Sequence, residues 1–151
     1  MPLSVEPHAD YSGRIAAARE RLGLDIADVA DQSAIGFDVL SALETDANAV
    51  CMSISLRELG ELCRVLNVRP AELLADALSG PTAALSPQEL VSAIRHYLEE
   101  HRMTPAAFSE HAGWDVEPAL ADGTRALDWN VDGLFDVCQV LELNWLHALP
   151  P

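Results

Sequence analysis

The sequence predicts an all-α protein made of two copies of one helical unit. Half of the 151 residues are hydrophobic but only 5% are aromatic, so the core consists mainly of Leu, Val, Ile and Ala, which suits helices better than sheets. Apolar residues recur at helical spacing through most of the chain, and no stretch alternates β-branched residues as a strand does. One long apolar pattern also occurs twice, which indicates an internal repeat.

The first unit is predicted to span residues 10–79, with helices near 11–22, 25–32, 36–45, 55–67 and 70–78. Gly23 follows the first helix as a stop signal, and Asp25 can cap the second helix with Asp28 in its first turn. Each break between these helices is short, so the unit is expected to be compact.

A linker is predicted at residues 80–86, in a stretch rich in residues that break helices. The helix that follows has a clear start. Ser86 can cap it, Pro87 suits its first position, and Glu89 completes a capping box.

The second unit is predicted to span residues 87–149, with helices near 87–101, 104–111, 115–121 and 130–142 and a short terminal turn. Thr104 is a suitable cap, while Gly113 and Gly123 interrupt the helical pattern.

The repeat is clearest between residues 56–68 and 131–143. Every apolar position of the first segment meets an apolar position of the second, and Cys63 meets Cys138. Both segments have apolar residues at i, i+3, i+6, i+7 and i+10, which is one face of a helix. The two cysteines are therefore expected to be small core residues.

The first unit resembles the Cro/lambda-repressor-like (Xre-type) helix-turn-helix family. The segments that carry the resemblance are 19–24, 29–35 and 39–44, followed by 55–59 and 62–74. The resemblance covers about residues 12–76, and a weaker one covers about 88–146. It implies two tandem lambda-repressor-like five-helix domains, the second of them degenerate.

The family commonly pairs an Arg late in the first helix with a Glu that ends the third. Arg19 and Glu44 occupy these positions, so the resemblance implies a structural ion pair. In the second unit the corresponding places fall at Leu98 and near Ala121, which carry no charge. The second unit is thus expected to fold without this pair.

Members of this family usually bind DNA through the third helix, which enters the major groove. Here the outer positions of that helix, taken as candidate contacts with DNA or with a partner, hold Gly36, Phe37, Asp38, Ser41 and Ala42. None of these is an Arg, Lys, Asn or Gln able to form bidentate contacts with bases. For Phe37 three interpretations stay open: a side chain buried or covered by a loop, an anchor for a protein contact, or a wedge into DNA.

The formal charge of −15 also opposes DNA binding. Every basic residue is Arg, and the acidity is spread over both units, with thirteen acidic and six basic residues up to Gly80 and eleven and three after it. Such a charge repels phosphate backbones and favours solubility or a basic partner.

We therefore expect a regulatory protein that acts mainly through protein contacts, with itself, with a basic regulator or with the transcription machinery. The alternative is a DNA-binding repressor that uses the first unit in a homodimer. No enzyme, cofactor or metal site is expected, because no catalytic motif or metal-binding spacing is found.

The cytoplasm is the expected location. The first residues form no signal peptide, and no run approaches the roughly 18 apolar residues of a membrane helix. Three cysteines without paired spacing do not form a disulfide framework. Cys51 lies in a predicted loop, residues 47–54, and in one interpretation its side chain is exposed to solvent.

Overall fold

The computed structural model describes residues 11–46, 49–74 and 85–150. Within these ranges every regular element is a helix, which confirms the predicted all-α class. No helix among the described residues combines the length and the apolar character needed to cross a membrane. Most of the predicted linker, residues 80–84, and the end of the predicted helix 70–78 lie outside the described ranges.

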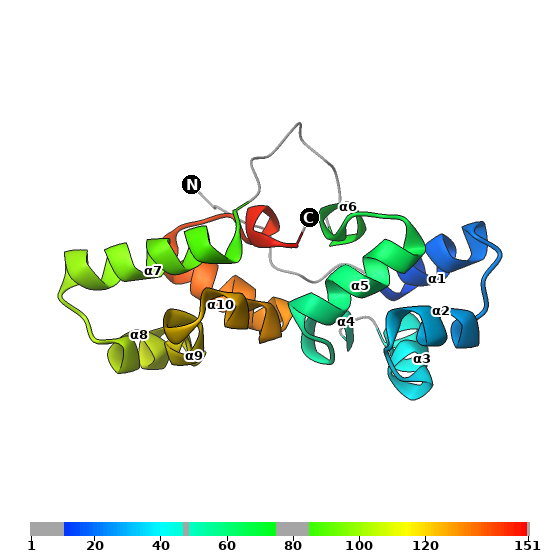
Figure 1. Ribbon diagram of the computed structural model, residues 1–151, viewed down its shortest axis with the longest axis horizontal. Helices are drawn as coiled ribbons and strands as arrows, with labels where there is room; N and C mark the ends of the chain where they lie inside the picture. The colour runs from blue at the N-terminus through cyan, green and yellow to red at the C-terminus, as the bar shows by residue number, and fades with distance from the viewer. Residues whose placement is uncertain (1–10, 47–48, 75–84, 151) are drawn as a thin grey trace.

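The N-terminal half contains six helices in its described residues (Figure 1). They are α1 (Tyr11–Arg21), α2 (Ile26–Ser33), α3 (Phe37–Thr45), α4 (Ala49–Met52), α5 (Leu56–Leu66) and α6 (Pro70–Leu74). Helix α1 contacts α3, α5 and α6, and α2 contacts α3 and α5. The helices therefore enclose one core, in which Leu43, Leu59 and Leu62 have no exposed surface.

The C-terminal half contains four α-helices and two 3-10 helices in its described residues. Its elements are α7 (Pro87–His101), α8 (Pro105–Ala112), α9 (Glu117–Ala121), the 3-10 helix η1 (Gly123–Asp128), α10 (Val131–Leu141) and the 3-10 helix η2 (Trp145–Ala148). Ile94, Phe108 and Leu134 are fully buried between α7, α8 and α10.

The predicted helix starts agree with the observed caps. The Asp25 side chain accepts a hydrogen bond from the Asp28 N–H at 2.8 Å, and the Ser86 hydroxyl accepts one from the Glu89 N–H at 3.1 Å. In both cases the side chain of the second residue accepts a hydrogen bond from the backbone N–H of the cap residue, which completes a capping box. The boundaries of α2 and α7 thus follow from residues close together in sequence.

Helix α4 was not predicted from the sequence. The segment 47–54 was expected to be a loop, yet Ala49–Met52 forms one helical turn. Its first three residues turn inward, and Cys51 is only 2% exposed. The suggestion that Cys51 is open to solvent is therefore wrong, because α4 packs against α10 of the other half.

Helices α5 and α10 share the features expected of a repeat. They have the same length, and each begins after a side-chain cap, Ser55 in one and Asn130 in the other. Each ends at a residue in the left-handed region, Asn67 or Glu142. The cysteines inside them, Cys63 and Cys138, are buried as predicted.

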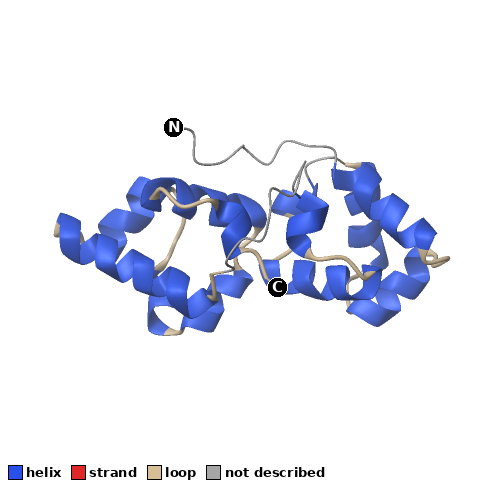
Figure 2. Cartoon of the chain, turned by 90° about the horizontal axis from the view of Figure 1, so that it is seen from above, coloured by secondary structure: helices blue, strands red, loops and turns tan. Residues whose placement is uncertain are grey.

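The N-termini of α5 and α10 meet where the two halves join. The Leu56 N–H donates to the Trp129 carbonyl at 2.7 Å, and the Asn130 amide donates to the Met52 carbonyl at 3.2 Å. On the other side of the junction α6 contacts η2. The halves therefore form one elongated body, with the junction near its middle (Figures 1 and 2).

Candidate interaction surface

The second and third helices of both halves lie along one edge of the molecule. In Figure 1 this is the lower edge, with α2 and α3 at one end and α8 and α9 towards the other. The two helix pairs turn in the same way, because α2 ends at Ala34 and α8 at Gly113, both in the left-handed region. We call the described residues of α2, α3, α8 and α9, with the turns between them, the lower edge.

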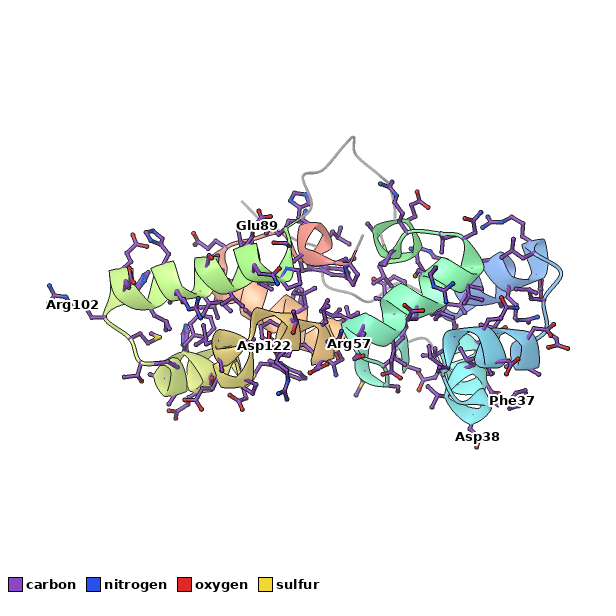
Figure 3. All side chains as sticks on the ribbon, in the orientation of Figure 1. Phe37, Asp38, Arg57, Glu89, Arg102 and Asp122 are labelled. Atoms are coloured by element: carbon purple, nitrogen blue, oxygen red, sulfur yellow. The ribbon has the colours of Figure 1, made fainter. Side chains whose placement is uncertain are left out.

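Three of the candidate contact residues at the start of α3 are exposed to solvent. Gly36, Phe37 and Asp38 are exposed, while Ser41 and Ala42 are half-buried. Phe37 is 53% exposed, so the interpretation of a buried or loop-covered Phe37 is wrong. The core of the N-terminal half is filled by the later residues of the helix, Leu40 and Leu43. Phe37 and Asp38 lie at the tip of the helix and point away from the body (Figure 3).

A shallow hollow lies beside Phe37, where α2 turns into α3. Most of the side chains that line it are small, and the lining residues are Ala27, Ala30, Asp31, Ala34, Ile35, Gly36 and Phe37. Because Ala and Gly leave the backbone uncovered, an element of a partner can approach this turn closely. An exposed aromatic side chain next to such a hollow is typical of a protein contact.

The lower edge is acidic and contains no Arg or Lys. Its four helices carry the exposed carboxylates of Asp28, Asp31, Asp38, Glu110 and Glu117, whereas Glu44 is nearly buried and paired with Arg19. Asp122 follows α9 directly and accepts hydrogen bonds from the hydroxyl and the N–H of Thr124, at 2.8 and 3.1 Å. These bonds lower the pKa of Asp122, so it stays ionised at neutral pH.

Seven of the nine arginines are engaged elsewhere in the molecule. Their partners are Leu73 for Arg14, Glu44 for Arg19, Asp128 for both Arg57 and Arg125, Glu61 for Arg64, Glu72 for Arg69 and Leu120 for Arg95. The other two, Arg21 and Arg102, lie at the ends of α1 and α7. Arg102 stands at one tip of the elongated body (Figure 3). Most of the positive charge is thus used for pairing within the protein, and two of these arginines, Arg19 and Arg95, contact α3 and α9 of the lower edge from α1 and α7.

Arg19 and Glu44 form a bidentate ion pair between α1 and α3. Nε of Arg19 donates to Oε2 of Glu44 at 2.9 Å and Nη2 donates to Oε1 at 2.8 Å. Nη1 donates to the Leu24 carbonyl at 2.9 Å. The hydrogen bond to Glu44 raises the pKa of Arg19. All three guanidinium nitrogens donate to groups of the protein and the side chain is only 16% exposed, so this Arg positions α3 and is not a surface contact.

The C-terminal half links its first and third helices in another way. Leu98 is half-buried and carries no charge, and Arg95, one turn earlier on α7, donates to the Leu120 carbonyl of α9. This contact was not predicted from the sequence, because Arg95 lies one turn before the position equivalent to Arg19. A search one turn along the same helix would have found Arg95.

Within the described ranges, no group of His, Cys, Asp and Glu residues is arranged to hold a metal ion. All three cysteines lie within these ranges, are buried and form no disulfide. Comparisons of the chain with protein-family models, with curated proteins and with solved structures find no match. Its function is therefore inferred from its own residues.

Proposed function

We propose that this chain is a regulatory protein with two tandem helix-turn-helix units of the lambda-repressor type, and that it acts by binding a protein partner in the cytoplasm. Support for the helix-turn-helix class comes from the matching order of α1, α2, α3 and α5 in one half and α7, α8, α9 and α10 in the other, and from the tight turns at Ala34 and Gly113. The Arg19–Glu44 pair, which the family resemblance implies, also supports it. In this proposal the protein binds a partner and does not catalyse a reaction.

One observation carries the proposal: the exposed tip of α3 holds Phe37 and Asp38 where a DNA-binding member needs Arg, Lys, Asn or Gln. A third helix that reads bases uses donors such as Arg, Asn or Gln. Affinity for DNA also requires several Lys or Arg near phosphates. Helix α3 lacks such donors and the lower edge lacks Lys and Arg, whereas an exposed aromatic residue suits a protein interface.

The charge of the lower edge indicates the kind of partner. Opposite charges speed the encounter of two proteins and select against wrong partners. A carboxylate-rich edge on a chain of net charge −15 favours a basic protein. Self-association through this edge brings like charges together, so a basic regulator or a basic part of the transcription machinery is the better candidate.

The test has two arms. In the first, fluorescence anisotropy with random duplex DNA at about physiological salt is expected to show no binding. In the second, the partner captured from the native host is identified and its affinity is measured with the purified protein. Phe37→Ala is expected to weaken that affinity at least about tenfold, which corresponds to 1.4 kcal/mol.

Leu22→Ala is the matched control, because Leu22 is also an exposed large apolar residue, 40% accessible, but lies at the end of α1. It is expected to leave the affinity unchanged. Circular dichroism of both variants checks that the fold is intact. Equal affinity of Phe37→Ala and the unaltered protein contradicts the proposal.

A second candidate is a DNA-binding repressor, and the position of α3 and α9 on the same edge favours it. Helix-turn-helix dimers read two half-sites with their third helices on one face, and here one chain provides such a pair. Nanomolar binding to a specific operator, with affinity falling steeply as salt rises, would establish this function in place of the first.

A further inference from the structure

The C-terminal half has a second hollow, of different chemistry from the one beside Phe37. It lies between the α8–α9 turn and η1 and has a volume of about 370 Å³. Its apolar lining comes from Trp114, Pro118 and Trp129, and its charged lining from Asp115, Arg125 and Asp128. Two tryptophans and a proline within one hollow form an aromatic socket, the name used for these six residues below.

The side chains of the socket are kept in position by the elements around them. The Trp114 ring rests against α10 at Gly133, so its position is set from behind. Trp129 is 4% exposed and its carbonyl accepts the Leu56 N–H from the other half. Pro118 is exposed in the first turn of α9. The apolar surfaces are therefore fixed in place before any partner arrives.

The charged groups around the socket are three carboxylates, of Asp115, Glu117 and Asp128, and two arginines, Arg57 and Arg125. Asp128 is neutralised by Arg57 at 3.3 Å and by Arg125 at 3.0 Å. Asp115 accepts a hydrogen bond from the Glu117 N–H at 3.0 Å, and both carboxylates are exposed at the rim.

We propose that the aromatic socket binds an aromatic side chain from a basic segment of a protein partner. Aromatic pairs gain energy beyond the burial of their area, and a Trp- and Pro-lined pocket is where such an anchor contributes most to binding. The carboxylates of Asp115 and Glu117 select Arg or Lys on either side of the anchor. A nucleic-acid base also stacks on tryptophan, but its phosphates would lie against these two carboxylates.

This inference adds a second contact site to the proposed function and does not depend on Phe37. The two sites lie in different halves, so a variant in one leaves the other intact. Loss of binding at the socket and loss of binding at the tip of α3 are therefore measured separately.

The test uses two short synthetic peptides, one with a central Phe between pairs of Arg and one with Ala in place of that Phe. Each is titrated into the full chain, and binding is followed by tryptophan fluorescence and by calorimetry. The Phe peptide is expected to bind at least about tenfold more tightly than the Ala peptide, and to change the tryptophan emission. This preference is expected to disappear in Trp114→Leu and to persist in Phe37→Ala.

Trp114→Leu keeps an apolar side chain against Gly133, and Pro118→Ala provides a second variant at an exposed position in case the first fails to fold. Pro118→Ala is expected to reduce the preference for Phe severalfold. Equal binding of the two peptides to the unaltered protein, or no saturable binding of either, overturns the proposal. A preference that survives in both socket variants also overturns it. Tight binding of single-stranded DNA with the same fluorescence change replaces it with a stacking site for bases.

Discussion

Gly133, in the first turn of α10, lies directly against the indole ring of Trp114. A Cβ atom at this glycine would stand 2.4 Å from Cε2 of the ring, far inside van der Waals contact. In the repeat, the residue of α5 that corresponds to Gly133 is Glu58, and the residue that corresponds to Trp114 is Ile35. The C-terminal half thus accommodates its larger aromatic residue by giving up a side chain on the helix beneath it.

Gly133→Ala is expected to lower the free energy of unfolding by roughly 1–3 kcal/mol, the usual cost of overpacking a filled site. Gly60→Ala is the control, because Gly60 is also inside a helix but a Cβ there would lie 3.5 Å from Pro150, an ordinary contact. It is expected to raise the stability by up to about 1 kcal/mol through helix propensity. Urea unfolding measures both.

The double variant Gly133→Ala with Trp114→Leu is expected to recover part of the loss, because the smaller side chain makes room for the new methyl group. If Gly133→Ala stabilised the protein as much as Gly60→Ala does, the close approach of Trp114 to α10 would be wrong.

Arg19→Met is expected to cost roughly 3 kcal/mol, since it leaves the Glu44 carboxylate, only 9% exposed, without its partner. Arg21→Met is the control, because Arg21 is exposed on the same helix. Arg14 is unsuitable for this purpose, as its guanidinium donates to the Leu73 carbonyl at 2.9 Å. Thermal melting compares the variants, and equal midpoints for Arg19→Met and Arg21→Met would refute the structural role of the pair.

Asp136→Asn is expected to stabilise the protein at neutral pH. Partial burial, and then the nearby charge of Asp132, raise the pKa of Asp136. A carboxyl group with a raised folded-state pKa destabilises the fold above that pKa, and stability is regained as the pH falls through it. The advantage of Asp136→Asn should therefore be present at pH 7 and shrink as the pH falls through the folded-state pKa towards the ordinary value.

Asp122→Ala is the opposite case. The hydrogen bonds from Thr124 lower the pKa of Asp122, so the charged carboxylate contributes stability above its ordinary pKa, which is lost as the pH falls through the folded value. This variant should be less stable than the unaltered protein at pH 7. Urea unfolding as a function of pH distinguishes the two, and a gain for Asp122→Ala at pH 7 would contradict its role as a cap.

None of the three cysteines is expected to react with a thiol reagent such as Ellman's reagent in the native protein. Burial raises the pKa of Cys51, Cys63 and Cys138 to about 12, and the charge of Asp132 adds to the effect on Cys51. Because the thiolate is the reactive form, all three should react only after unfolding in guanidinium. Rapid reaction of a single cysteine in the native state, identified as Cys51, would show that α4 opens away from α10.

The sequence by itself determined the all-α class and the start and length of most helices. Asp25, Ser86 and Thr104 cap the helices that they were expected to begin, and the buried faces of α5 and α10 follow from their apolar spacing. These features depend on residues within one or two turns of each other. Local hydrogen bonds and the helical period therefore suffice to define them.

Only the tertiary structure decided what joins the two halves and what reaches the surface. The turn of α4, the bond between Leu56 and Trp129 and the contact of Trp114 with Gly133 involve segments far apart in the chain. The exposure of Phe37 could not be predicted from the sequence for the same reason, because its position relative to the core depends on how α3 packs against α1 and α2. Tertiary packing stabilises segments whose own helical preference is weak, such as residues 49–52. The pattern of neighbouring residues in the sequence does not predict this packing.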